Sequence, residues 1–209
     1  MSWQKSWLTL SLIIISVAVS LAIGFGDNHA MMRLLTFTDF SVRGAQLLHH
    51  TLSGMLSTGQ WWRLVTPAFM HFSEMHLIFN LLWIWVVGQR IELLQGRWVL
   101  LILVLVSAML SNLAQFLVSG PMFGGMSGVV YAVLAYTWLW DRRGFRPVFG
   151  LPPALMGFML VWLVLGYTGM LQVFGMAAVA NTAHLVGLLV GLMFVLPVRL
   201  LQHLLQKQP

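Results

Sequence analysis

The sequence predicts an all-α membrane protein, a single bundle of six transmembrane helices. Hydrophobic residues make up 59% of the 209 residues and charged residues only 8%, with a mean hydropathy of +0.88. Soluble domains carry about 25% charged residues, so this surface must largely face lipid. The apolar residues also come in long runs, and the alternating pattern of a membrane β-barrel is not visible.

Cysteine content and charge narrow the classes further. The chain has no cysteine, which excludes a disulfide framework, a thiol nucleophile and thiolate metal ligands. Its formal net charge of +6 raises the question of nucleic-acid binding, but the basic residues are scattered between apolar segments and suit membrane orientation better. We expect no nucleic-acid partner, no metal and no cofactor, with membrane lipid around a monomer or weak homo-oligomer.

Six apolar segments account for the predicted spans, because a spanning helix needs about 20 apolar residues. A signal peptide is the alternative for the first segment. Its apolar run from Trp7 to Ile23 is longer than the about 7–15 residues of a signal-peptide core, so we interpret it as a retained helix. We expect residues 1–209 to form one membrane domain without a separate cytoplasmic domain. The predicted spans are 7–25, 74–90, 98–118, 127–140, 153–171 and 181–200.

The first loop, residues 26–70, is the longest stretch of low hydropathy. Loops of this length are often functional. Trp61 and Trp62 suit the membrane interface, so we expect short helices lying in or on one leaflet. The pair His49-His50 suggests a metal, but solvated side chains are the favoured interpretation.

The fourth predicted helix is short. Its 14 residues from Ser127 to Trp140 cover about 21 Å, less than the hydrocarbon core of about 30 Å. Ser127 should therefore lie below one membrane surface, reached by the non-helical segment 119–126. Such backbone must be buried in protein or line a wet cavity, so we expect a water-filled cavity at Ser127.

The positive charges predict the topology. With the N-terminus in the cytoplasm, eight basic residues fall in cytoplasmic segments and three in outer ones, in agreement with the positive-inside rule. Both termini are then cytoplasmic, and the Ser127 end of the fourth helix faces outward. The cytoplasmic set is Lys5, Arg90, Arg97, Arg142, Arg143, Arg146, Arg199 and Lys207; the outer set is Arg33, Arg43 and Arg63.

Ser127 is the candidate nucleophile, in Gly125-Met126-Ser127-Gly128 at the start of a helix. Serine is a weak nucleophile until a base takes its proton. Of the seven histidines, only His76 and His184 fall near the outer ends of spans. Ionisable groups inside spans are costly and usually functional, which favours His184 as the base. The alternative is a histidine that is only hydrogen-bonded within the bundle.

Small residues three or four apart predict that the fourth and sixth helices pack closely. If the two stripes face each other, Ser127 and His184 meet at the same depth. Tyr131 lies one turn below Ser127 and can pack under the imidazole. The alternative is that both stripes serve packing alone. The stripes are Gly128, Ala132 and Ala135 on the fourth helix and Ala183, Gly187 and Gly191 on the sixth.

The five carboxylates of the chain lie far from His184 in the sequence, which favours a Ser-His dyad over a triad. The alternative is an acid at the depth of His184 supplied by Glu74 or by the loop aspartates Asp27 and Asp39. Donors for the oxyanion are the Ser127 N–H at a helix N-terminus and the pair His76 and Asn80, four residues apart on one face. For Asn80 the alternative is an interhelical hydrogen bond. The H-E-x-x-H motif of metalloproteases is absent, because His71 and His76 are five residues apart and the glutamate is misplaced. An aspartyl intramembrane protease needs two aspartates within its spans, and this sequence has none there.

The combined motifs resemble the rhomboid family of intramembrane serine proteases, most closely its bacterial GlpG-type group with six spans. Gly-x-Ser-Gly alone is a weak signal, whereas four pieces in this order form a strong one. The resemblance covers about residues 60–195. The pieces are Trp62-Arg63, His76-x-x-x-Asn80, Gly125-Met126-Ser127-Gly128 with Tyr131, and Ala183-His184-x-x-Gly187-x-x-x-Gly191.

The resemblance implies a role for each piece. Ser127 would be the nucleophile, His184 the base, and Tyr131 the residue that stacks on it. His76, Asn80 and the Ser127 N–H would bind the oxyanion. The Trp62-Arg63 loop would lie partly in the outer leaflet. Substrates would be transmembrane segments with small residues at the scissile site, admitted by the fifth helix and a loop over 174–180. The enzyme would reside in the bacterial inner membrane.

Two residues depart from close relatives. Pro67 stands where they carry histidine, which puts the hydrogen bonding of the first loop in doubt, and Thr182 stands where glycine is expected. Two other functions stay open. A catalytically silent relative would bind transmembrane helices as a chaperone or adaptor. A small transporter would need transport-linked charges within spans or two repeated halves, and the sequence shows neither.

Overall fold

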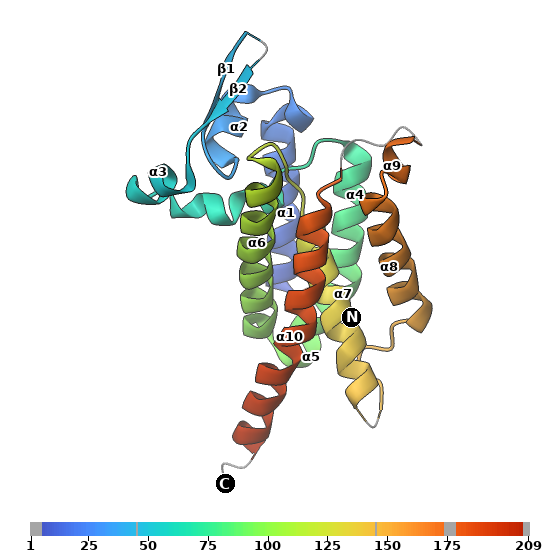
Figure 1. Ribbon diagram of the computed structural model, residues 1–209. Helices are drawn as coiled ribbons and strands as arrows, with labels where there is room; N and C mark the ends of the chain where they lie inside the picture. Colours follow the sequence, from blue (N-terminus) through green and yellow to red (C-terminus); the bar gives the residue numbers. More distant parts are fainter. Residues whose placement is uncertain (1–5, 45, 145, 174–178, 207–209) are drawn as a thin grey trace.

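The computed structural model describes residues 6–44, 46–144, 146–173 and 179–206 (Figure 1). Each of the six apolar segments is helical. The second contains a π-helical turn, η5, between two α-helices. The bounds are α1 Trp7–Ala22, α4 Glu74–Trp83, η5 Ile84–Gly88, α5 Gln89–Gln95, α6 Arg97–Ser119, α7 Ser127–Arg143, α8 Pro153–Tyr167, α9 Met170–Val173 and α10 Asn181–Gln206.

Three of the described helices are long and apolar enough to cross a membrane: Glu74–Gln95, Arg97–Ser119 and Asn181–Leu204. Two shorter apolar helices are α1 and α8. α7 has 17 residues. The predicted gate loop is only partly visible, because residues 174–178 lie outside the described ranges, as do Lys5 and Lys207.

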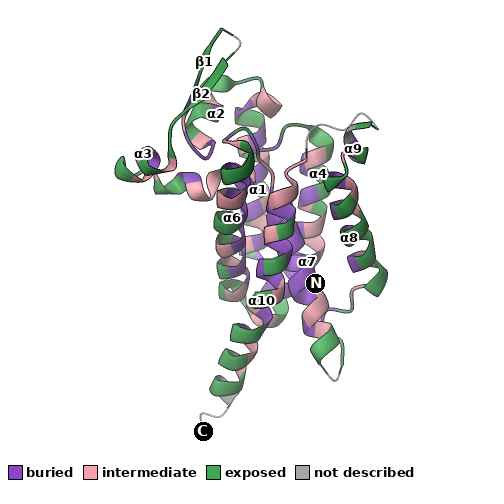
Figure 2. Ribbon diagram, viewed as in Figure 1, coloured by how far each residue is buried: buried purple, intermediate pink, exposed green. Residues whose placement is uncertain are grey.

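α7 lies at the centre of the bundle, with α10 and α6 packed against it and α8 at the periphery (Figure 1). Eleven of its 17 residues are buried, on all sides of the helix (Figure 2). A helix that is apolar all round is expected to be surrounded by other helices. The residue that begins this central helix is Ser127, so the candidate nucleophile is carried by the most enclosed element of the fold.

Glu92 on α5 ties down the start of α1. Its carboxylate accepts the N–H groups of Leu8 at 2.9 Å and Thr9 at 2.8 Å, and the Thr9 hydroxyl at 2.6 Å. The first N–H groups of a helix have no acceptor within the helix, and a negative charge there is favourable. This carboxylate is therefore engaged in helix packing, far along the chain from His184.

The first loop contains short helices, as predicted, and also a β-hairpin, which was not predicted. β1 (Phe40–Arg43) pairs with β2 (Gln46–His49) in antiparallel register. The prediction of an all-α fold is therefore wrong in this loop. Gly44 has φ +61°, a left-handed conformation that suits a tight turn. The helical elements here are α2 His29–Leu35, α3 Leu52–Ser57, η3 Trp61–Leu64 and η4 Thr66–Phe69, and η2 Gly24–Gly26 leads into the loop.

Candidate active site

The turn before Ser127 requires glycine at position 125. Gly125 has φ +114°, and a Cβ on it would overlap the imidazole of His76. Its N–H donates to the carbonyl of Pro67 at 3.0 Å. The Gly-x-Ser-Gly pattern is thus explained by a left-handed turn that presses against the first loop and against α4.

The structure brings Ser127 and His184 into direct contact. The distance between Ser127 Oγ and His184 Nε2 is 2.7 Å. Ser127 is partly buried, and only 5% of His184 is exposed. A hydroxyl proton can pass to Nε2 only if that nitrogen is unprotonated, so the competent neutral imidazole carries its hydrogen on Nδ1. This is the geometry of a nucleophile next to its base.

Backbone contact between α7 and α10 creates this geometry. A Cβ on Gly187 would overlap the carbonyl oxygen of Gly128, and one on Gly191 would overlap that of Ala132. The two predicted stripes therefore face each other. Gly128 is also close to α6, because a Cβ on it would lie 2.9 Å from the Ser111 side chain of that helix. Three helices thus meet at Gly128, one residue after Ser127.

Tyr131 stacks on the imidazole of His184. The ring centroids are 4.7 Å apart and the planes differ by 15°. The Tyr131 hydroxyl donates to the carbonyl of Met159 on α8 at 3.0 Å. The Tyr131 ring is fixed by stacking on one face and by the hydrogen bond of its hydroxyl. It therefore restricts the rotation of His184 about its side-chain bonds.

The carboxylates of the chain are either engaged in other contacts or exposed. Asp39 pairs with Arg33 at 2.9 Å, and Glu92 caps α1. Asp141 accepts the N–H groups of residues 148–150 at 2.7–3.0 Å. Asp27 and Glu74 are exposed. His184 Nδ1 is buried, and in the described part of the chain it has no hydrogen-bond partner. Among the described residues, no carboxylate is therefore hydrogen-bonded to His184.

The predicted oxyanion donors occupy different positions. The N–H of Ser127 belongs to the first turn of α7, where the helix offers no acceptor. His76 lies against Gly125, two residues before Ser127. Asn80 is buried, but its side-chain amide donates to the His76 carbonyl at 2.8 Å. Asn80 keeps a second amide hydrogen, and the structure does not join it to Ser127.

A small cavity lies beside Ser127. Its volume of about 10 Å³ is room for the centre of a single water molecule. Small side chains dominate its walls, among them Ala68, Ala108, Ala180 and Ala183. Among the described residues, no three His, Asp or Glu side chains gather closely enough to hold a metal ion.

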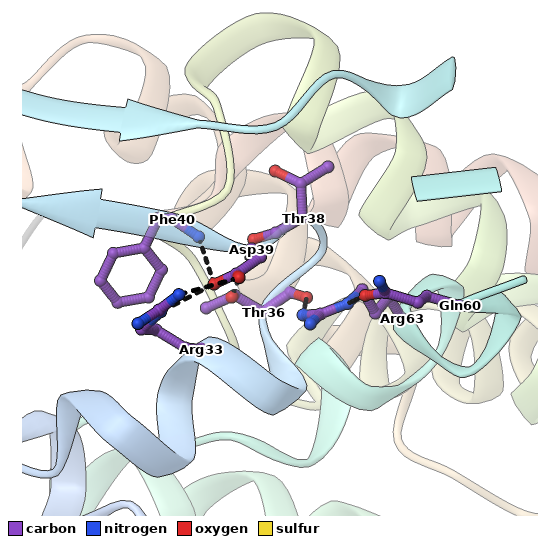
Figure 3. Close-up of polar contacts among 7 residues, drawn as sticks. All are labelled: Arg33, Thr36, Thr38, Asp39, Phe40, Gln60 and Arg63. Atoms are coloured by element: carbon purple, nitrogen blue, oxygen red, sulfur yellow. Dashed lines mark hydrogen bonds and ion pairs between the residues drawn. The ribbon is translucent and has the colours of Figure 1, made fainter. Parts of the chain in front are cut away.

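Trp62 and Arg63 lie in the first loop and do not contact Ser127. Arg63 is buried and donates to the Thr36 carbonyl at 2.8 Å and to the side chain of Gln60 (Figure 3). The indole N–H of Trp62 donates to the Leu34 carbonyl at 3.1 Å. These bonds join η3 to the end of α2. The Trp-Arg pair therefore holds the first loop together, which is a supporting position.

Two polar residues near the site were not among the sequence candidates. His71 is buried and contacts the turn before Ser127, as described below. Gln115 on α6 accepts the N–H of Ala183, next to His184, at 3.0 Å. A polar residue within the predicted span 98–118 was the available signal for Gln115. His71 had no signal beyond being one histidine among several in or at the end of the first loop.

Comparison with known proteins identifies the family of the chain. The rhomboid domain family matches residues 58–200. The chain is 39% identical over 186 residues to the Rhomboid protease GlpG of Pectobacterium atrosepticum. It is 37% identical over 196 residues to the Rhomboid protease GlpG of Photorhabdus laumondii, and 37% over 190 residues to that of Yersinia pestis. The chain belongs to the rhomboid family.

The alignments cover most of this chain but only part of its relatives. They take in 89%, 94% and 91% of this chain, and 60%, 63% and 62% of the three relatives. The chain thus spans about three fifths of the length of the curated relatives it matches. Together with the apolar helices, these relatives indicate a bacterial membrane protein.

Proposed function

We propose that the chain is an intramembrane serine endopeptidase, which hydrolyses peptide bonds in or near transmembrane segments. The 2.7 Å contact between Ser127 Oγ and His184 Nε2 carries the proposal. Family membership supports it, and the relatives named above are proteases by name. The paired side chains have the roles that acyl transfer requires, a nucleophile and the base that takes its proton.

In the proposed reaction, Ser127 Oγ attacks the carbonyl carbon of the scissile bond while His184 Nε2 takes the hydroxyl proton. The oxyanion that forms accepts hydrogen bonds from the Ser127 N–H, His76 and Asn80. His184 then gives its proton to the leaving amine, and an acyl-enzyme ester remains. Water from the outer side attacks the ester and passes its proton to His184, which returns the hydrogen to Ser127. One oxyanion donor is worth about 10²–10³ in kcat.

The cavity supports a preference for small residues at the cleaved bond. With a volume of about 10 Å³ and several alanines in its walls, it is too small for a large side chain. Transmembrane proteins with small residues at the scissile site are the proposed substrates. We place their entry at α8 and the segment over 174–180, of which residues 174–178 lie outside the described ranges.

We further propose six spans in a single domain, with both termini in the cytoplasm and the bilayer of the inner membrane around a monomer or weak homo-oligomer. The 17 residues of α7 rise about 25 Å, less than the hydrocarbon core of about 30 Å. This supports a start of α7 below the outer surface. Trp61 and Trp62 are 59% and 51% exposed, which supports an interfacial first loop.

The test is covalent labelling of the purified protein by a fluorophosphonate probe, together with cleavage of a transmembrane substrate in liposomes. Ser127→Ala and His184→Ala should each abolish both reactions. Ser57→Ala, which changes an exposed serine of the first loop, should leave them intact. Cleavage of the same bond by Ser127→Ala would remove the nucleophile assignment. A folded wild-type protein that neither reacts with the probe nor cleaves would favour a helix-binding relative.

A further inference from the structure

His71 is a buried histidine with contacts on both sides of its ring. It lies between η4 and α4, outside the helices. Its Nδ1 is 3.2 Å from the Phe69 carbonyl and 3.2 Å from the Ser20 hydroxyl of α1. Its Nε2 accepts the backbone N–H of Met126 at 3.3 Å. The residue that directly precedes Ser127 is therefore tied to the first loop through this one ring.

These contacts select one form of the imidazole. An N–H group can only donate, so Nε2 must accept from Met126 and cannot carry a hydrogen. The hydrogen of the ring then sits on Nδ1, where the Phe69 carbonyl can accept it. Burial agrees with a neutral ring, since it lowers the pKa of His71 to about 3. The titratable group that faces it is His76, with ring centroids 4.9 Å apart.

Residues 67–71 accept hydrogen bonds from two consecutive backbone N–H groups of the turn before Ser127. The Gly125 N–H donates to Pro67, and the Met126 N–H donates to His71. Close packing continues at position 124, where a Cβ would lie 2.8 Å from the Met70 carbonyl. These two N–H groups point toward the first loop. The following N–H, that of Ser127, lies at the start of α7 and remains available to donate to a substrate.

We infer that His71 is a positioning residue of the proposed protease: as a neutral acceptor for the Met126 N–H, it sets the orientation of the turn and so aims the Ser127 N–H and hydroxyl at the reacting carbonyl. This inference rests on the proposed function. His71 acts through the backbone and does not touch the substrate. It is therefore distinct from His76, which is assigned to the oxyanion itself.

Two substitutions at position 71 separate the acceptor from the rest of the ring. In His71→Gln, the amide lies as far along the side chain as Nε2 and can accept from Met126. In His71→Asn, the amide lies at the place of Nδ1, so it can still donate to Phe69 but does not reach Met126. Both variants remove the imidazole and lose similar packing, which makes them matched controls for stability.

The experiment measures kcat and KM with a quenched-fluorescent transmembrane substrate in liposomes, and the melting temperature of each variant. His71→Asn should lower kcat about tenfold with little change in KM, and His71→Gln should stay within about threefold of wild type. Fluorophosphonate labelling rates should follow kcat. Equal kcat values for the two variants would overturn the inference, because a purely structural role depends on the shared loss of the ring.

A measurement on the wild-type protein tests the inference even if the variants fail to fold. The ¹⁵N chemical shifts of the His71 ring should show the neutral form with hydrogen on Nδ1 from about pH 8 to about pH 5. A hydrogen on Nε2, or a charged ring in this range, would overturn the inference. Failure of the proposed function looks different: wild type itself would not react through Ser127. If wild type reacts and the two variants do not differ, only the role of His71 is wrong.

Discussion

The central helix α7 contacts α10 and α8 in different ways. Toward α10, backbone packs on backbone, with Gly187 over the Gly128 carbonyl and Gly191 over that of Ala132. Toward α8, the contacts are made by side chains, such as the Tyr131 hydroxyl on the Met159 carbonyl. Most of α8 faces outward, and its large apolar side chains Phe158, Val161 and Val164 are 54%, 58% and 59% exposed.

The α7–α10 contact fixes the positions of the site residues, whereas the α7–α8 contact tolerates substitution. Small residues let two helices approach until their backbones touch, and such a contact has little freedom to slide. Ser127 and His184 lie where both helices begin, and the proposed reaction needs them at hydrogen-bond distance. The contact with α8 ends in long side chains, which can rearrange. We therefore expect substitutions in the α7–α10 contact to damage the site far more than those on α8.

The largest effect is expected for Gly187→Ala. The added Cβ would overlap the Gly128 carbonyl, which cannot turn away because it belongs to the helix backbone. The two helices must separate, with a loss in unfolding free energy of about 3 kcal/mol and near-complete loss of activity. Thermal unfolding in detergent and fluorophosphonate labelling measure both.

The matched control is Gly157→Ala on α8. An added Cβ there meets nothing within 4 Å, so the melting temperature should stay constant or rise slightly. A melting temperature of Gly187→Ala equal to that of wild type would contradict the backbone contact. An equal loss in both variants would show that the helices respond to the substitution itself and not to the contact.

A smaller effect is expected for Gly166→Ala, where α8 approaches the start of α10. The added Cβ would overlap the side chain of Asn181, which can rotate, so the cost should be about 1 kcal/mol. Asn181→Ala in the same chain should restore the melting temperature. If the double variant melts as low as Gly166→Ala, then the contact is not between these two side chains.

The smallest effect is expected in the first loop, from the ion pair of Arg33 with Asp39. The guanidinium of Arg33 holds the pKa of Asp39 below its usual value of 3.8. A carboxyl with a lowered pKa stabilises the fold above that value, and this contribution disappears as the pH falls through the pKa of the folded state. The pair is exposed, so it should contribute little.

Comparison of wild type with Asp39→Asn from pH 7 to pH 3 measures this contribution. Wild type should melt slightly higher at pH 7, and the difference should shrink as the pH falls below 3.8. Labelling of Ser127 at pH 7 should be the same in both, since the pair lies outside the α7–α10 contact. A difference in melting temperature that persists unchanged at pH 3 would assign it to a cause other than the charge.

Helical spacing in the sequence correctly predicted which residues share a face of α7 and of α10. Periodicity of four placed Gly128 and Ala132 on one face of a helix and Gly187 and Gly191 on another, and the structure packs those faces together. The same argument placed Tyr131 under the imidazole of His184, where it stacks. Helical spacing is a short-range property, so the sequence carries it directly.

The features that were missed depend on partners far along the chain. The hairpin over 40–49 has strands of only four residues, too short for a clear alternating pattern. The π-helical turn η5 interrupts a span that reads as one continuous helix. His71 and Met126 are 55 residues apart, and no spacing rule connects them.

The sequence by itself determined that this is a helical membrane protein, which helices carry small-residue faces, and that Ser127 and His184 are candidates for a nucleophile and its base. Composition, periodicity and residue chemistry are local, so they can be read without coordinates. The tertiary structure decided which carboxylates are engaged elsewhere, that the Asn80 amide donates to the His76 carbonyl, and that His71 holds the turn before Ser127. Those outcomes depend on packing between distant segments, because a hydrogen-bond partner is chosen by proximity in space and not by separation in sequence.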